Sequence, residues 1–142
     1  MNADTLGALN HFFSKLPFMK AGTVSNGEID FAENALGIKF ATDYRVFISD
    51  FGGAMVGRCP IYGLRHAGPM DDNLWSVVDV TEHFRRQSWP GTDSWYIISM
   101  DHAGNPIGLD ELGKVLCYDH DARDLIEVAP DFESYLLDCL KS

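Results

Sequence analysis

The sequence predicts an α+β domain in which an antiparallel sheet, a meander in the C-terminal half, packs beside N-terminal helices and a closing C-terminal helix. Helix signals gather in the first 50 residues and at the C-terminus, whereas β-rich runs separated by glycine turns fill most of the chain between them. The length of 142 residues suits one domain with one core. Because no linker or low-complexity tract divides the chain, we expect a single domain over residues 1–142.

Two amphipathic helices are expected first. Residues 5–16 carry apolar side chains at helical spacing behind Asp4, which is the expected cap. The second helix begins at a capping box, in which Ser25 and Glu28 satisfy each other's free backbone donors. Gly37 ends this helix, because glycine adopts the left-handed conformation of a helix C-terminus without steric cost.

A third, short helix and two short strands should follow. Thr42 is the expected cap of the helix, and Gly52 and Gly53 release the chain from helical geometry. The apolar runs at 54–56 and 61–64 predict strands.

Residues 74–87 give two conflicting signals. Trp75, Val77 and Val78 are typical of a strand, whereas the residues from Thr81 onward are typical of a helix. We therefore divide the segment at Val80 into a strand followed by a helix.

The last third has the more regular pattern. Three β-rich runs, at 95–100, 106–110 and 114–120, are separated by glycine-containing turns and predict an antiparallel meander. Residues 125–129 are expected to add a strand, and a final helix should begin at Pro130 and Asp131. The core beneath the helix pair is expected to include five residues: Leu36, Tyr44, Phe47, Ile97 and Val115. For the three tryptophans, Trp75, Trp89 and Trp95, core packing is favoured over a ligand pocket.

Charge restricts the classes of partner. The chain has 11 Lys and Arg against 21 Asp and Glu, a net charge of −10. From residue 101 onward ten acids face three bases, which is −7. Such a field repels nucleic acid and anionic membranes and attracts a basic protein, although solubility alone also explains it. No stretch approaches the length of a membrane span or has the form of a targeting signal, so a cytoplasmic location is expected.

The residues that carry chemistry do not match a familiar catalytic pattern. Cys59, Cys117 and Cys139 are widely spaced without a C-x-x-C pair, which favours reduced thiols over disulfides or a zinc site. Glu33 could be a general base, but a solvated or capping carboxylate is the favoured interpretation. We therefore expect a protein that is not an enzyme and binds no cofactor.

One cluster of polar residues has two interpretations. In a meander the end of the first strand and the end of the third lie at the same sheet edge, which should bring Asp101 and His102 close to Asp119, His120 and Asp121. These five residues are our candidate partner-binding site. Two imidazoles and three carboxylates could also ligate a divalent ion, but their spacing matches no known metal motif, and turn chemistry explains the acids as well.

An ordered series of motifs resembles the SUKH superfamily from about residue 24 to 140. The series is Ser25-x-x-Glu28-Ile29-x-x-Ala32-Glu33-x-x-Leu36-Gly37-Ile38, Asp43-Tyr44-Arg45-x-Phe47, Gly52-Gly53, Ile61-Tyr62-Gly63-Leu64, Trp95-Tyr96-Ile97-Ile98, Asp101-x-x-Gly104-Asn105, Gly113-x-Val115, Asp119-His120-Asp121 and Phe132-Glu133-x-Tyr135-Leu136. The resemblance implies an α+β fold shared by a fungal regulator of cell-wall synthesis and by bacterial immunity proteins. The latter bind and neutralise toxins, often nucleases or deaminases.

Two hypotheses of function follow. The first is a non-catalytic immunity protein that binds a cognate, basic toxin, as the resemblance implies. The alternative is a metal- or small-molecule-binding protein, and this class includes enzymes with an unfamiliar site. A toxin-sized reading frame directly upstream would favour the first hypothesis, and a place in a metabolic operon would favour the second.

Overall fold

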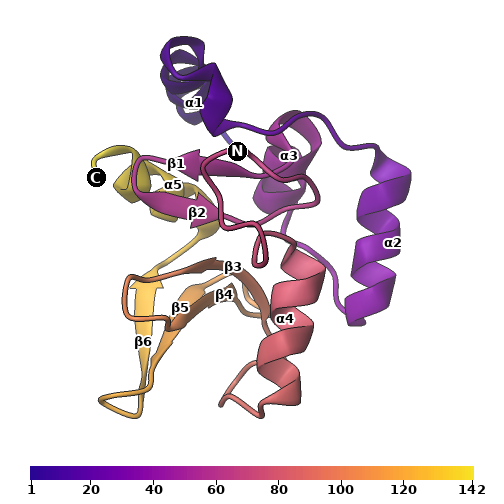
Figure 1. Cartoon of the computed structure of the whole chain (residues 1–142), viewed down its shortest axis with the longest axis vertical. Coiled ribbons are helices and arrows are strands. Elements are labelled where there is room, and N and C mark those ends of the chain that lie inside the picture. The colour runs from indigo at the N-terminus through magenta and orange to yellow at the C-terminus, as the bar shows by residue number, and fades with distance from the viewer.

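The computed structural model describes residues 1–142 and confirms the α+β prediction (Figure 1). Helices lie at the N-terminal side and beside the sheet, and the chain closes with a helix as expected. The elements in order are α1 (Ala3–Lys15), the 3₁₀ turn η1 (Pro17–Met19), α2 (Asn26–Leu36), α3 (Thr42–Phe51), β1 (Ala54–Val56), β2 (Cys59–Ile61), α4 (Val77–Arg86), β3 (Tyr96–Met100), β4 (Pro106–Leu109), β5 (Val115–Asp119), β6 (Asp124–Ala129) and α5 (Phe132–Leu140). None of the helices is long and apolar enough to cross a bilayer.

The caps of the first three helices confirm one prediction and correct two. At α2 the Ser25 hydroxyl accepts from the Glu28 amide, and the Glu28 carboxylate accepts from the Ser25 amide, as the capping box predicts. The cap of α1 is Asn2, whose side chain accepts from a backbone amide one turn on, and not Asp4, which lies in the first turn. Thr42 is the first residue of α3 and not its cap.

The second strand lies two residues earlier than predicted. β1 and β2 form a hairpin in which Val56 pairs with Cys59, so the strand is Cys59–Ile61 and the prediction of 61–64 is wrong. Pairing with β1 sets this register, which a short apolar run cannot specify alone. Just after β2, the Tyr62 amide donates to the Ile98 carbonyl at 2.8 Å, which links the hairpin to β3.

The division of residues 74–87 is also wrong. α4 already begins at Val77, and the hydroxyl of Ser76 accepts from the Asp79 amide as its cap. Val77 and Val80 are both buried, so their spacing of three residues marks the core face of a helix and not a strand. The Thr81 hydroxyl then accepts from the Ile97 amide at 2.8 Å and fixes α4 beside β3.

The predicted meander is confirmed as a four-stranded antiparallel sheet in the order β3-β4-β5-β6. β6, the strand expected at residues 125–129, forms its outer edge, and Figure 1 shows it on the side of the sheet away from α4. The final helix starts at an Asp131 cap, close to the predicted start.

All five predicted core residues are buried in one hydrophobic cluster. Tyr44 lies at its centre, where its ring packs against Phe40, Tyr96 and Phe132 and its hydroxyl donates to the Tyr62 carbonyl at 2.6 Å. Of the tryptophans, Trp95 is buried, whereas Trp75 and Trp89 are half-buried and pack against the cluster.

Candidate functional site

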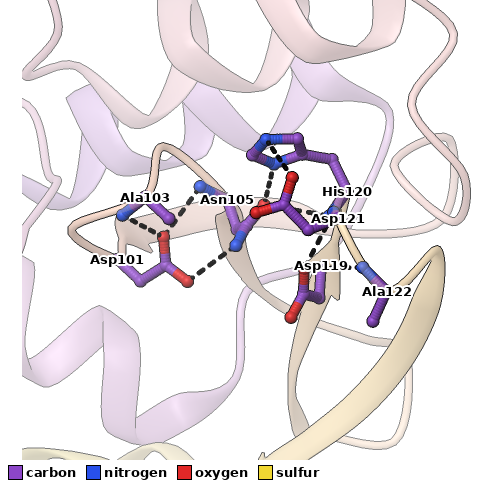
Figure 2. A network of polar contacts seen from close by, with 7 residues as sticks. All are labelled: Asp101, Ala103, Asn105, Asp119, His120, Asp121 and Ala122. Carbon is purple, nitrogen blue, oxygen red and sulfur yellow. Dashed lines mark hydrogen bonds and ion pairs between the residues drawn. The ribbon is translucent and has the colours of Figure 1, made fainter.

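The turn after β3 is organised by Asp101. One carboxylate oxygen accepts from the backbone amides of Ala103 and Asn105, both at 2.9 Å, and the other accepts from the Asn105 side chain at 2.9 Å (Figure 2). This is the local turn chemistry that aspartate favours at strand ends. Asp101 is therefore committed to the structure of its own turn.

Asn105 joins this turn to the one between β5 and β6. Its side chain is only 3% exposed, and its Oδ1 atom accepts from the His120 amide at 3.0 Å while also contacting the His120 ring. Figure 2 shows Asn105 lying between Asp101 and His120. In the sequence, Asn105 is only the last residue of the motif that begins at Asp101. No local pattern indicated that its side chain is buried.

The second turn has its own polar contacts. Asp119 accepts from the amides of Asp121 and Ala122 at 2.9 and 3.1 Å, and Asp121 lies 3.4 Å from the His120 ring nitrogen Nε2. The nearby Cys117 thiol has a pKa raised to about 11, first by burial and then by the carboxylates of Asp101 and Asp119. The field in this corner of the sheet is thus negative.

The structure brings four of the five candidate residues together at one end of the meander: Asp101, Asp119, His120 and Asp121. His102 is exposed in the first turn and takes no part in the network of Figure 2. No group of three or more His, Cys, Asp or Glu side chains is placed to hold a metal ion. These residues are held in place by hydrogen bonds from backbone amides and from Asn105, and they are not arranged around a common metal position.

Exposed apolar side chains that the sequence analysis did not identify lie on both faces of the edge strand β6. Leu125, Ile126 and Val128 are 50%, 45% and 37% exposed, although they belong to the residue types most often buried. Because successive side chains of a strand point to opposite faces, Asp124 and Ile126 lie on one face of β6, and Leu125 and Glu127 lie on the other. We call Asp119, Asp121, Asp124, Leu125, Ile126, Glu127 and Val128 the β6 surface.

A concave surface lies elsewhere, between α2 and the start of α4. This groove has a volume of about 660 Å³, is lined mainly by Ala32, Ala35, Leu64 and Val78, and has Phe31, 76% exposed, at its rim. Glu28 and Arg65 form an ion pair at 2.8 Å beside it. The Arg65 guanidinium, helped by the Ser25 amide, lowers the pKa of Glu28.

Glu33 is a carboxylate with a structural role, but the expectation that it is solvated is wrong, because the residue is buried. One oxygen accepts from the Phe40 amide at 2.6 Å, and the other accepts from Arg45 at 2.7 Å. Both oxygens are therefore engaged in joining α2 to the loop before α3 and to α3 itself.

Comparison with known proteins agrees with this fold and with the motif series. No curated protein matches the chain. A family model described as the SMI1 / KNR4 family (SUKH-1) matches residues 23–138, which is most of the chain and nearly the range of the resemblance in the sequence. The chain therefore belongs to the SMI1 / KNR4 family (SUKH-1).

Proposed function

We propose that this domain is a non-catalytic immunity protein of the cytoplasm, which binds a cognate bacterial toxin such as a nuclease or deaminase and neutralises it by occlusion. Membership of the SUKH-1 family supports a protein-binding role. The observation that carries the proposal is the β6 surface, where three exposed apolar side chains lie among four carboxylates.

The two kinds of residue on the β6 surface have different tasks in this proposal. Carboxylates at the rim of an interface mainly accelerate encounter with a basic partner, and this effect falls as salt rises. Leu125, Ile126 and Val128 supply the lasting affinity, because their burial by a partner removes apolar area from water. Such a site suits a basic toxin with an apolar centre in its contact surface.

The absence of catalysis is part of the proposal. Glu33, the one carboxylate that suggested a general base, has both oxygens occupied by internal donors. The net charge of −10 opposes binding to DNA or RNA. Purified protein should show no hydrolase activity, and micromolar binding to nucleic acid at physiological salt would contradict the proposal.

The direct test uses the protein encoded immediately upstream of this gene as the candidate toxin. The double variant Leu125→Ser/Ile126→Ser should lose at least tenfold in affinity, mainly through faster dissociation, and should fail to protect cells that express the toxin. The control, Phe31→Ser, changes an even more exposed apolar residue at the rim of the groove and should bind like the parent. Equal binding by the parent and the double variant would exclude the β6 surface.

Charge is tested separately. The triple variant Asp121→Asn/Asp124→Asn/Glu127→Gln removes three charges but leaves Asp101 and Asp119, which hold the turns. Its association rate at low salt should fall several-fold, and the difference from the parent should disappear at high salt. A triple variant that associates as fast as the parent at low salt would contradict electrostatic steering.

The groove between α2 and α4 favours the alternative, a small-molecule-binding protein, because it is concave and largely apolar. Ala35→Trp would place a large ring in the groove and obstruct it. If the toxin is bound through the β6 surface, this variant protects cells fully. Loss of protection by Ala35→Trp together with full protection by the β6 double variant would assign binding to the groove instead.

A further inference from the structure

The turn of the β1–β2 hairpin lies directly against the C-terminal end of α5, and Figure 1 shows the two side by side. The Arg58 amide donates to the Ser142 hydroxyl at 2.9 Å, and this hydroxyl donates to the Cys139 carbonyl at 2.6 Å. A Cβ atom on Gly57 would lie 2.1 Å from the same carbonyl oxygen, so no side chain fits between the two segments. The contact joins segments that are 84 residues apart in sequence.

This contact places two thiols together. Cys59, the first residue of β2, is half-buried, whereas Cys139 of α5 is buried, and both are free. The Cys59 and Cys139 thiols lie beside each other, close to the hydroxyls of Tyr135 and Ser142. The Ser142 hydroxyl donates to the Cys139 carbonyl and the Tyr135 hydroxyl donates to Ser99, so the Cys139 thiol is the donor available to a thiolate at Cys59.

The Cys139 thiol makes the largest contribution to lowering the pKa of Cys59, to about 7. The pKa of Cys139 itself is raised, first because its thiol is the donor to Cys59 and then by burial. The half-buried Cys59 is thus the nucleophile of the pair, and Cys139 keeps its proton in the reduced protein. The nucleophile of a reactive pair needs this combination of thiolate character and access.

We propose that Cys59 and Cys139 form a redox pair, in which a hydroperoxide oxidises Cys59 and Cys139 then closes a disulfide between β2 and α5. In the first step the Cys59 thiolate attacks an oxygen of the peroxide and breaks the O–O bond, which gives a sulfenic acid and releases hydroxide from hydrogen peroxide or an alkoxide from an organic hydroperoxide. In the second step the Cys139 sulfur attacks the sulfenic sulfur and forms the S–S bond. The leaving hydroxide takes the Cys139 proton, and the product is water. The pair loses two electrons, and the peroxide gains them.

The third cysteine is an internal control. Cys117 is buried, and its pKa is raised to about 11 by this burial and by the carboxylates of Asp101 and Asp119. It has little thiolate at neutral pH, so a hydroperoxide should leave it reduced. The proposal therefore predicts a single disulfide, between Cys59 and Cys139, and no oxidation of Cys117.

The disulfide would close a loop of about 80 residues and restrict the unfolded chain, so the oxidised protein should melt at a higher temperature than the reduced one. This consequence does not depend on the proposed immunity function. It requires only the contact between the hairpin and α5.

The test treats the whole purified protein with hydrogen peroxide at equimolar concentration and maps the peptides without reduction. The expected product is a peptide that links Cys59 to Cys139, formed together with a rise in Tm that dithiothreitol reverses. Cys117→Ser should give the same product. Cys139→Ser keeps a hydroxyl donor beside Cys59 but removes the second sulfur, so oxidation should stop at a Cys59 sulfenic acid that dimedone traps.

A second measurement avoids variants altogether. The alkylation rate of Cys59 by iodoacetamide should follow a thiolate with a pKa of about 7 in the folded protein and close to 9 after unfolding in urea. Three results would overturn the proposal: Cys59 that titrates near 9 when folded, a disulfide that joins Cys59 to a second copy, or sulfinic acid at Cys59 without a linked peptide.

Discussion

Strands β3 and β6 belong to the same antiparallel sheet but have opposite surroundings. In β3 every residue from Tyr96 to Ser99 is buried, whereas in β6 every residue from Asp124 to Val128 is exposed. α4 packs against β3 on one side. The chain just after the β1–β2 hairpin also bonds to β3, because the Tyr62 amide donates to the Ile98 carbonyl. β6 pairs with β5 alone and forms the outer edge. One end of the sheet thus contributes to stability, and the other is available to a partner.

An exposed edge strand is a hazard, because its free backbone groups and apolar side chains invite pairing with another chain. In β6 the charges of Asp124 and Glu127 interrupt the apolar residues and oppose pairing with a second acidic copy of itself. The same charges do not oppose a basic partner. The edge is therefore more consistent with selective binding than with poor packing.

The largest loss of stability should come from a substitution in the buried core. Phe47→Ala removes a fully buried ring that packs against Phe51 and Phe132, and it should lower the free energy of unfolding by about 3–5 kcal/mol. Phe31→Ala is the matched control, since that ring is largely exposed, and its cost should be below about 1 kcal/mol. Urea unfolding measures both. Equal costs would show that α3 does not pack as described.

Two isoleucines of the same sheet provide the sharpest comparison. Ile97→Ala in β3 should cost about 2–5 kcal/mol, because Ile97 is fully buried. Ile126→Ala in β6 should cost less than about 1 kcal/mol, because the side chain is 45% exposed already. Chemical denaturation gives both values. If Ile126→Ala were as costly as Ile97→Ala, β6 would belong to the core, and the β6 surface could not be a free docking site.

An intermediate effect is expected at the joint between the two turns. Asn105→Ala leaves the His120 amide and one oxygen of Asp101 without their partner, and it should cost about 1–3 kcal/mol. Amide hydrogen exchange of His120 should also become faster. Asn73→Ala, at an exposed asparagine in a loop, is the control and should change neither quantity. Unchanged exchange at His120 would show that Asn105 does not hold the second turn.

The smallest expected change is in the pH dependence of stability, and it concerns Glu28 of α2, which lies outside the sheet. Because Arg65 and the Ser25 amide lower the pKa of Glu28 below 4.5, its ionised form stabilises the folded state. This contribution is complete above about pH 4.5 and is lost as the pH falls through the lowered pKa. The Tm difference between the parent and Glu28→Gln should therefore be largest near neutral pH and should shrink in acid. A difference that grew below pH 4 would contradict the assigned ion pair, and added salt should reduce it at neutral pH.

The sequence was most informative where the signal is local. The Ser25–Glu28 capping box and the left-handed Gly37 depend on a few adjacent residues, and both are present in the structure. The meander was also predictable, because its turns and alternating runs are short-range features. The start of α4 was misplaced because β-branched residues such as Val77 and Val78 favour strands locally, whereas packing against the core selects the helix.

The candidate site was predictable only in part. Strand order alone brings Asp101 and Asp119 to one end of the meander, as expected for a first and a third strand. The exposure of Leu125 and Ile126 was not predictable, because a short apolar run has the same sequence pattern at a sheet edge as in a core. Which strand remains uncovered depends on where the helices pack.

By itself, therefore, the sequence determined the fold class, the Ser25–Glu28 capping box, the turns of the meander and the family. The tertiary structure alone decided the burial of Glu33, the bridging position of Asn105, the contact between Cys59 and Cys139 and the exposure of β6. The physical reason is the range of the interactions. Caps and turns are formed by hydrogen bonds within about four residues, whereas burial and the pairing of distant side chains exist only after the whole chain has packed.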